Sequence, residues 1–400
     1  MTSATVPLGE IISPAAVRRA GTTELPILSM TMRNGLVDQA DKFKKRVASA
    51  DTSAYRVVDR GQLVVGFPID EGVLSFQDLY DSAMVSPAYE VWDLKQPELV
   101  SCTFLQRFLR SPRALQYYAA KLQGSTARRR SLPRDVFLAL PVPVFSFAEQ
   151  LRIAALLDQV DTLRAKRREA IALLDDLASS LFSGMFGDVI KRGGGVPLSS
   201  VADISSGITK GRKVPSGDLR TTPYLAVANV QDRALDLSTV KEIAASVAEI
   251  ERYKLLSEDL LLTEGGDPDK LGRGTLWRDE LPVCIHQNHV FRVRVKTRAE
   301  VDPLYLNWVM SSSYGKGYFL RTAKQTTGIA SINKTQLGEF PLPVPPIARQ
   351  KDFRSRIESV QESQQAHRTH LATLDELFTS LQHRAFSGTL WEHDATGEAA

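Results

Sequence analysis

The stretch LDDLASSLFSGMF at residues 174–186 returns as LDELFTSLQHRAF at residues 374–386, exactly 200 positions later. Around this stretch, residues 138–188 and 338–388 align without a gap. A repeat of this length is not a solenoid unit, because solenoid units span roughly 20–50 residues. The chain is therefore interpreted as two halves of similar plan, each closed by the same element.

Each copy of the repeat opens with a proline-rich lead, at residues 140–144 and 340–346. Proline fixes φ and disfavours helix in the residue before it, so both leads should be extended. A long helix is expected next, over residues 148–182 and 348–385, because neither stretch contains Pro or Gly. At about 1.5 Å per residue, each helix would extend on the order of 50 Å.

Apolar residues recur along both helices in alternating steps of three and four, which is the seam of a coiled coil. The predicted seam residues are Ile153, Leu156, Val160, Leu163, Leu174, Leu177, Leu181, Phe353, Val360, Leu374, Leu377 and Leu381. The middle of the second helix, residues 361–370, is polar. Because neither helix could stand alone, we expect the two to pack as an antiparallel intramolecular coiled coil. Packing of each helix on a separate core is the alternative.

The stretches outside the repeat show short strand patterns, turn signals and a few helices, which is typical of α+β domains. Strands are expected at 62–65, 89–94, 259–263 and 289–295, and helices at 104–122 and 304–320. The predicted fold class is α+β, with two α/β domains separated by two long antiparallel coiled-coil helices in a pseudo-two-fold repeat. The predicted boundaries are 1–137 and 191–337 for the domains, 138–190 and 338–388 for the helix regions, and 389–400 for a flexible tail.

The composition, with 43% hydrophobic and 24% charged residues, is that of a soluble globular protein. No apolar run approaches the roughly 18–20 residues of a membrane span, and residues 1–10 do not have the pattern of a secretory signal. The two cysteines, Cys102 and Cys284, lie far apart without metal-ligand spacing and suit a reducing cytoplasm. We therefore expect a cytoplasmic protein with two buried thiols and no membrane contact.

The charge is unevenly distributed along the chain. Residues 1–137 carry 18 basic and 14 acidic side chains, and residues 191–337 carry 21 and 16. The repeated regions are acidic, with 5 basic and 7 acidic side chains in 138–190 and 6 and 9 in 338–400. The positive excess therefore lies outside the repeat, which indicates a polyanionic partner for those parts.

A search for catalytic motifs finds no phosphate-binding loop, no Gly-x-Ser-x-Gly elbow and no His-Glu-x-x-His helix. His286 and His289 are three residues apart, but in a strand their side chains would point to opposite faces, which suits a metal poorly. No catalytic residue and no metal ligand is predicted.

Several loops instead combine glycine with Lys, Arg and amide side chains, which can contact phosphates and base edges. The candidate DNA-binding residues are Lys42, Lys44, Lys45, Arg46, Arg128, Arg129, Arg130, Thr209, Lys210, Arg212, Lys213, Asp267, Lys270, Arg273, Gln287, Asn288 and Lys334. The alternatives are a solvated helix face for residues 42–46 and an ordinary turn for the glycine-rich loop at 264–274. Recurrence of such segments at equivalent places in both halves favours the binding interpretation.

The order of variable domain, proline-rich lead and long helix, repeated twice, resembles the specificity subunit of type I restriction-modification systems. The resemblance rests on the doubled leads, on Gln150 and Gln350 after them, and on the doubled helix ends at 177–188 and 374–388. The stretch 264–277 is similar to a segment common in the recognition domains of that family. Taken together, these features span essentially the whole chain.

This resemblance implies a non-catalytic subunit of a DNA-methylating phage-defence system. Each variable domain would be a target-recognition domain for one half of a bipartite double-stranded DNA target, and the helices would set the spacer. Two methyltransferase subunits would dock on this scaffold and bring S-adenosylmethionine. A restriction and translocase subunit, using ATP and Mg, could join. The first domain lacks the Gly-x-Thr-Lys loop and the Gly-Gly-Asp run of the second.

Three other functions remain open at this point. The first is a recognition subunit of a related system whose partner fuses nuclease and methyltransferase. The second is a coiled-coil scaffold with two protein-binding domains and no role on DNA. The third is a nuclease or methyltransferase activity that the motif search does not detect.

Overall fold

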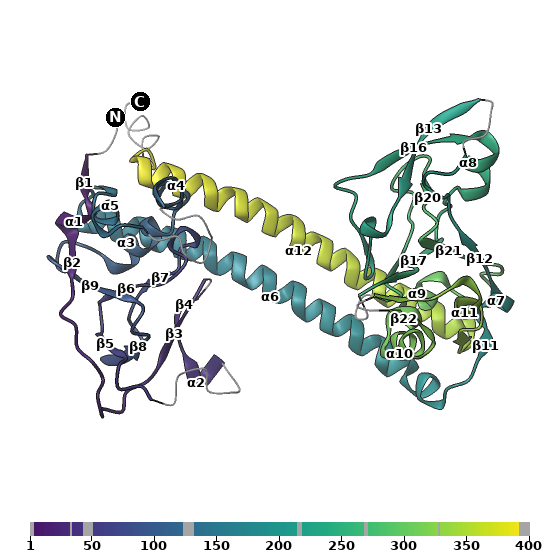
Figure 1. The fold of residues 1–400 in the computed structure, drawn as a ribbon, viewed down its shortest axis with the longest axis horizontal. Coiled ribbons are helices and arrows are strands. Elements are labelled where there is room, and N and C mark those ends of the chain that lie inside the picture. The colour runs from purple at the N-terminus through teal and green to yellow at the C-terminus, as the bar shows by residue number, and fades with distance from the viewer. Residues whose placement is uncertain are drawn as a thin grey trace, which may run out of the picture. The chain divides into compact units, whose positions relative to one another are not determined.

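The computed structural model describes residues 4–32, 34–42, 51–122, 132–213, 218–267, 271–326 and 329–391 (Figure 1). The chain divides into two compact units. The first unit comprises residues 1–169 and 368–400, and the second comprises residues 170–367. Each of the two longest helices therefore contributes one part to each unit.

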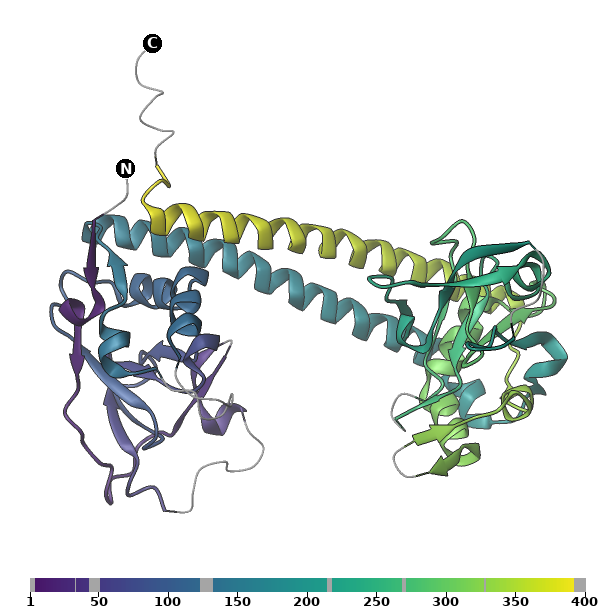
Figure 2. The ribbon, with the colours of Figure 1, turned by 45° about the horizontal axis from the view of Figure 1, so that its top comes forward.

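The two longest helices are α6 (Phe147–Arg192) and α12 (Ile347–Ser387), with 46 and 41 residues. Within the second unit, the Asp175 side chain of α6 accepts a hydrogen bond from Gln364 of α12 at 2.8 Å. Further along α6, Phe182 packs on Phe353 with ring centroids 5.7 Å apart. The partner number on α12 falls as the number on α6 rises, so the helices run antiparallel, as Figure 2 also shows. The predicted antiparallel helix pair is confirmed.

The first long helix runs ten residues beyond its predicted end at 182, through Gly184 and Gly187. Phe186 is completely buried, with its ring centroid 4.7 Å from that of Tyr305 and 5.2 Å from that of Phe353. Burying a Phe side chain contributes about 1.5–3 kcal/mol, whereas each helical glycine costs about 1 kcal/mol. Tertiary packing therefore extends the helix past two residues that local propensity treats as stops.

The predicted seam is buried in part. Ile153, Val160, Phe353 and Val360 are buried, and Leu156, Leu174, Leu181, Leu374 and Leu381 are half-buried. Leu163, Leu177 and Leu377 are instead exposed, by 40%, 46% and 44%. The buried stripe passes through their neighbours, such as Ala178 and Phe378, and includes polar positions such as Gln364. A seam chosen by hydrophobicity alone misses such positions, because their polar groups are satisfied by partners on the facing helix.

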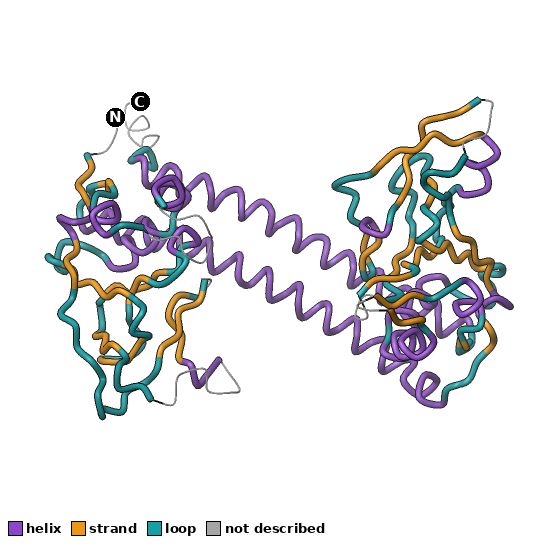
Figure 3. The backbone as a smooth tube through the Cα atoms, in the orientation of Figure 1, coloured by secondary structure: helices purple, strands orange, loops and turns teal. Residues whose placement is uncertain are grey.

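The first unit mixes helices and strands (Figure 3). Its main sheet has the order β2-β9-β6-β7, entirely antiparallel, with β2 at Ile12–Pro14, β9 at Glu90–Leu94, β6 at Leu63–Val65 and β7 at Leu74–Phe76. Two further antiparallel pairs are the hairpin of β3 (Leu28–Thr31) with β4 (Gly35–Asp38) and the non-consecutive strands β5 (Arg56–Asp59) and β8 (Ser82–Val85). The helices are α1 (Leu8–Ile11), α2 (Gln39–Lys42), α3 (Cys102–Leu109), α4 (Pro112–Lys121) and α5 (Arg134–Leu138). Phe104, Phe108 and Phe386 form the centre of its core, so the end of α12 is an integral part of this unit.

The second unit repeats this plan. Its main sheet has the order β12-β21-β17-β19, with β12 at Ala202–Ser206, β21 at Val290–Val295, β17 at Leu260–Thr263 and β19 at Gly274–Leu276. Smaller sheets are β16-β13-β20 (Lys241–Ser246, Leu219–Leu225, Ile285–His286), β18-β23-β22 (Gly265–Gly266, Ile329–Ser331, Lys324–Thr326) and β14-β15 (Val230–Gln231, Ala234–Leu235). The helices are α7 (Leu198–Val201), α8 (Val247–Tyr253), α9 (Pro303–Ser311), α10 (Ser313–Thr322) and α11 (Lys334–Gly338).

The ranges 104–122 and 304–320 are helical as predicted, but each contains two helices. Ser111 and Ser312 lie at the breaks, each as the N-cap of the second helix, and their hydroxyls accept from the amides of Ala114 and Gly315. An N-cap serine satisfies a helix amide that would otherwise lack a partner. The capping hydroxyl therefore stabilises a new helix start where apolar periodicity alone predicts continuity.

The proline-rich leads are short strands in both units. In the first unit β10 (Pro141–Pro143) pairs with β1 (Thr5–Pro7), and in the second β24 (Pro341–Leu342) pairs with β11 (Val196–Pro197). Both pairs are antiparallel and join the start of a unit's domain to the lead of its repeated segment. The repeat seen in the sequence is therefore also a repeat of tertiary connections.

Candidate nucleic-acid interface

Four segments of the second unit that are distant in sequence meet beside β17 and β21. The Ile208 amide donates to the His286 carbonyl at 2.8 Å, and the Asn288 amide donates to the Ile208 carbonyl at 3.0 Å. The Glu264 amide donates to the His289 carbonyl at 3.0 Å, and the Ile332 amide donates to the Glu264 carbonyl at 2.9 Å. We call the surface formed by residues 207–213, 264–267, 286–289 and 329–334 the four-segment surface.

Most of the predicted binding side chains on this surface are accessible. Thr209, Lys210, Lys213, Asp267 and Lys334 are exposed, and Gln287 and Asn288 are half-buried. Within the described part of the chain, the ammonium groups of Lys210, Lys213 and Lys334 have no ion-pair partner. The loops that sequence patterns single out separately thus form one basic surface in the fold.

A hydrogen-bonded chain of side chains crosses the same surface. The His289 ring approaches Glu264 at 2.6 Å between Nδ1 and Oε2, and Asn288 Nδ2 lies 3.3 Å from His289 Nε2. With Nδ1–H donating to the carboxylate, Nε2 can accept from the amide, so a neutral imidazole satisfies both contacts. These contacts restrict the orientation of the Asn288 amide, a group that can recognise base edges.

Two predicted binding residues are engaged inside the unit. The Arg212 guanidinium donates to both carboxylate oxygens of Glu249, at 2.6 and 2.8 Å, and to the Ala244 carbonyl at 3.0 Å. The hydrogen bonds from Arg212 lower the pKa of Glu249 to about 2. Arg273 Nη1 donates to the Gln231 side chain at 2.8 Å. These guanidinium groups therefore stabilise the contacts of α8 and β14, and their role on DNA stays a prediction.

The structure does not describe the side chains of the remaining predicted DNA-binding residues. Lys42 is the last residue of α2, but its side chain is not described. Lys44, Lys45, Arg46, Arg128, Arg129, Arg130 and Lys270 lie outside the described residues. The binding surface of the first domain therefore stays a prediction from the sequence.

Sequence reasoning missed the arginines of β21. Arg294 donates to both carboxylate oxygens of the buried Asp259, each at 2.7 Å, and Arg292 donates to the Lys254 carbonyl at 3.0 Å. Their spacing of two in a strand puts both side chains on one face, which is a signal that the pattern VFRVRV at 290–295 carries.

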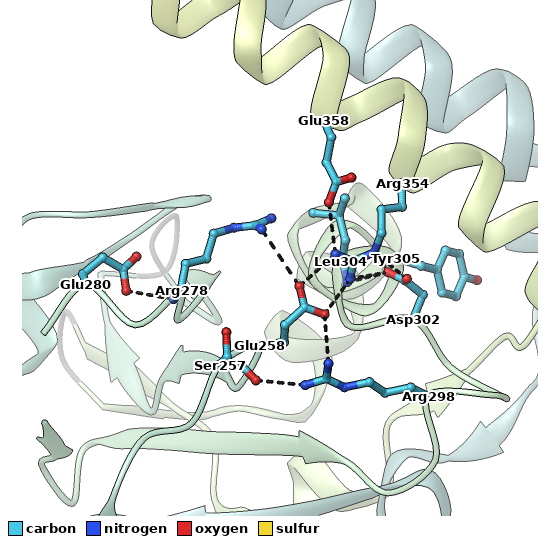
Figure 4. A network of polar contacts seen from close by, with 10 residues as sticks. All are labelled: Ser257, Glu258, Arg278, Glu280, Arg298, Asp302, Leu304, Tyr305, Arg354 and Glu358. Carbon is cyan, nitrogen blue, oxygen red and sulfur yellow. Dashed lines mark hydrogen bonds and ion pairs between the residues drawn. The ribbon is translucent and has the colours of Figure 1, made fainter. Parts of the chain in front are cut away.

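A second missed network joins α12 to the start of α9 (Figure 4). The Arg354 guanidinium contacts Asp302 at 2.6 Å, Glu258 at 2.8 Å and Glu358 at 3.2 Å. Burial disfavours the charge of Arg354, but its hydrogen bonds with Asp302 and Glu258 outweigh this and raise the pKa of Arg354. Asp302 is also the N-cap of α9, where it accepts from the amides of Leu304 and Tyr305. This network has a structural role, because the carboxylates of Asp302 and Glu258 form ion pairs and hydrogen bonds within the unit.

The described residues offer little for covalent or metal chemistry. Burial raises the pKa of the Cys284 thiol to about 12, so the thiolate form of this residue is scarce at neutral pH. Burial also lowers the pKa of His286 to about 4, and its Nδ1 lies 2.7 Å from the Val290 carbonyl. Within the described ranges, no group of three or more His, Cys, Asp or Glu residues is placed to hold a metal.

One helix, α6, contains an 18-residue window whose mean hydropathy of 1.2 and low charge would by composition suit a membrane span. Only 17% of that window is buried. Such a window is weak evidence for a membrane, because α6 also buries Phe182 and Phe186 against aromatic residues of the second unit.

Comparisons with known proteins agree on one family. The chain is 20% identical over 172 residues to the MjaX type I restriction enzyme specificity subunit of Methanocaldococcus jannaschii, an alignment that covers 43% of this chain and 40% of that protein. It is 23% identical over 320 residues to the EcoKI type I restriction enzyme specificity subunit of Escherichia coli, which covers 74% of this chain and 67% of that protein. No family model matches the chain.

Among solved structures, the type I restriction-modification S subunit of M. genitalium matches with a TM-score of 0.54 at 12% identity. That match covers 96% of this chain and 95% of the S subunit. The sequence relatives and the shared fold confirm the resemblance predicted from the doubled segment. This chain is thus similar, in sequence and in fold, to the specificity subunits of type I restriction-modification systems.

Proposed function

We propose that this chain is the DNA-recognition subunit of a type I restriction-modification complex. Each target-recognition domain binds one half of a bipartite double-stranded DNA target. The two long helices set the spacing between the half-sites and provide the docking surface for methyltransferase subunits. The chain itself carries no catalytic residue and acts in the cytoplasm.

One observation carries this proposal above the others, namely the four-segment surface of the second unit. Loops that are up to about 120 residues apart in sequence converge there, and they present exposed Lys210, Lys213 and Lys334 beside the amides of Gln287 and Asn288. Lysines neutralise phosphates, and amides recognise base edges, so one surface combines positioning and readout groups. A scaffold that binds only proteins has no need of this combination.

The partners follow from the same proposal. Two methyltransferase subunits bring S-adenosylmethionine and perform the methyl transfer, and a translocase-nuclease subunit, where present, uses ATP and Mg. This division suits a chain in which burial keeps the Cys284 thiol protonated at neutral pH. The proposal therefore assigns the chemistry to the partners and the choice of sequence to this chain.

The direct test is DNA binding by the complete complex as a function of salt concentration. Each phosphate contact that is lost should reduce the slope of log K against log[salt] by about 0.9. Lys210→Ala, Lys213→Ala and Lys334→Ala should each reduce the slope by about this amount. Lys351→Ala, which removes an exposed lysine of α12 outside the four-segment surface, should leave the slope unchanged.

Methylation mapping tests the assignment of half-sites. Gln287→Ala or Asn288→Ala should change which bases are methylated or tolerated in one half-site only. Insertion of one heptad into each long helix should widen the gap between the half-sites, since seven residues add about 10 Å to a helix. If the mapped target keeps its half-sites and its gap in all these variants, the proposed function is wrong.

A further inference from the structure

Two pockets occupy equivalent places in the repeat, one in each unit. In the second unit, a pocket of about 390 Å³ lies between the end of α6 and the break between α9 and α10. In the first unit, a pocket of about 180 Å³ lies between the end of α12 and the break between α3 and α4. Each pocket is complete within its own unit.

Several of the lining positions correspond in the repeat. Ser179 and Ser183 of α6 line the larger pocket, and Thr379 and His383, at the same positions of the repeat in α12, line the smaller one. The N-cap serines that break the neighbouring helices, Ser312 and Ser111, correspond in the same way. Two pockets at matching positions of an internal repeat indicate two copies of one kind of occupant.

The larger pocket has an aromatic floor and a basic rim. Phe182 and Trp308 pack together with ring centroids 5.6 Å apart, and the Arg233 guanidinium lies 4.3 Å above the Trp308 ring. Lys191 also lines the pocket, and it has no ion-pair partner in the part of the chain that the structure describes. Trp308 is 6% exposed, and its Nε1 has no hydrogen-bond partner among the described residues.

The smaller pocket also combines an apolar side chain with basic groups, although Phe386 and Arg113 do not stand at the positions of Phe182 and Arg233 in the repeat. Phe386 forms its apolar wall, and Arg113, His383 and several hydroxyl groups surround it. Arg113 Nη1 donates to the Phe386 carbonyl at 3.1 Å, which holds the guanidinium at the rim. Among the described residues that line the two pockets, none is Asp or Glu. Each pocket therefore suits a group that joins a carboxylate to an apolar side chain.

We propose that each pocket binds an acidic segment of one methyltransferase subunit, so that one chain carries two copies at its two repeat ends. This inference rests on the proposed function, which supplies a partner present in two copies. A carboxylate of the segment pairs with Arg233 and Lys191 in the second unit, and with Arg113 in the first. The neighbouring apolar side chain of the segment packs on Phe182 or on Phe386.

The test measures how many methyltransferase subunits each variant of the full chain binds, by native mass spectrometry and sedimentation. The variant with Lys191→Glu and Arg233→Glu should lose one copy, and Arg113→Glu should lose the other. Each change should weaken binding of that copy at least tenfold. All three changes together should abolish assembly. The matched control, Arg19→Glu with Lys241→Glu, reverses one exposed charge in each unit, away from the long helices and from both pockets, and should retain both copies.

A second variant guards against misfolding as the cause. Ser183→Trp fills the larger pocket from the exposed side of α6 without changing charge, and it should also leave one copy bound. If the wild-type chain binds two copies and the pocket variants do so with unchanged affinity, the inference is overturned while the proposed function stands. If the pocket variants keep both copies but lose salt-dependent affinity for DNA, the occupant is a phosphate backbone, and the inference is again wrong. If the wild-type chain binds no methyltransferase at all, the proposed function fails with it.

Discussion

Gln350 offers the sharpest test of how the repeated segment is joined to the rest of its unit. This side chain is completely buried at the start of α12. Its Oε1 accepts from the Asp302 amide at 2.8 Å, and its Nε2 donates to the Glu300 and Pro345 carbonyls at 3.0 and 2.7 Å. Gln350→Ala would therefore remove three hydrogen bonds that connect α12 to the start of α9 and to the proline-rich lead.

The expected cost follows from the groups left behind. A buried donor or acceptor without a partner costs about 1–3 kcal/mol. Asp302 and Pro345 are buried, whereas Glu300 is exposed, so its carbonyl can bond to water. Two groups thus bear the full penalty, and we expect Gln350→Ala to destabilise the second unit by about 3 kcal/mol. At about 1.4 kcal/mol per factor of ten, this corresponds to a roughly hundredfold faster exchange of protected amides.

Hydrogen exchange followed by mass spectrometry measures this locally, in peptides that cover residues 296–310. Gln350→Glu is the more discriminating variant, because it keeps the shape and the contact with the Asp302 amide. At pH 7, however, a carboxylate oxygen replaces the amide group that donates to the Glu300 and Pro345 carbonyls, so two hydrogen bonds become repulsive contacts between oxygens. Wild-type exchange rates in Gln350→Glu at pH 7 would refute the reasoning.

Gln150 provides the matched control in the first unit. Its Oε1 accepts from the Ser101 amide at 2.9 Å, and its Nε2 donates to the Leu99 and Phe145 carbonyls at 3.0 and 3.1 Å. Gln150→Ala should increase exchange in peptides that cover residues 96–110 and leave those at 296–310 unchanged. Gln350→Ala should do the reverse.

Three further predictions concern the second unit. Burial lowers the pKa of His286 to about 4, whereas an unfolded histidine titrates near pH 6.5. Between pH 4 and pH 6.5, unfolding is therefore coupled to the uptake of a proton by this side chain. Stability should therefore fall by about 3 kcal/mol as the pH drops from 6.5 to 4, and His286→Gln should remove this component from urea titrations. A double-mutant cycle of Arg212→Gln and Glu249→Gln should give a coupling of about 1 kcal/mol at pH 7. Arg354→Met should destabilise by about 3 kcal/mol because it removes the guanidinium that neutralises the buried Asp302 and the half-buried Glu258, whereas Arg356→Met, which removes an exposed ion pair of the same helix, should cost less than about 0.5 kcal/mol in thermal unfolding.

The division into two similar halves could be predicted from the sequence because the same residues recur 200 positions apart. Gln150 and Gln350 show why that offset is meaningful, since each makes the same three kinds of hydrogen bond in its own unit. The helix breaks at Ser111 and Ser312 were missed. A capping hydroxyl looks like any other serine inside an amphipathic pattern.

The candidate surface was predictable only in part. Glycine and lysine in the loop at 207–213 indicated accessibility, and Lys210 and Lys213 are indeed exposed. Arg212 lies between them in the chain but pairs with Glu249, 37 residues away. Local composition cannot distinguish these neighbours, because the partner of Arg212 is supplied by a different helix.

The two-half plan, the pair of long helices and the positions of the basic loops can be predicted from the amino-acid sequence alone. These features depend on repetition, periodicity and the absence of helix breakers, all of which are local properties of the chain. The end of α6, the burial of individual seam residues and the internal ion pairs of the arginines follow instead from the three-dimensional fold. Each of these depends on the packing or hydrogen bonding of groups far apart in sequence, as Arg273 and Gln231 illustrate. Such partners become neighbours only once the fold has formed.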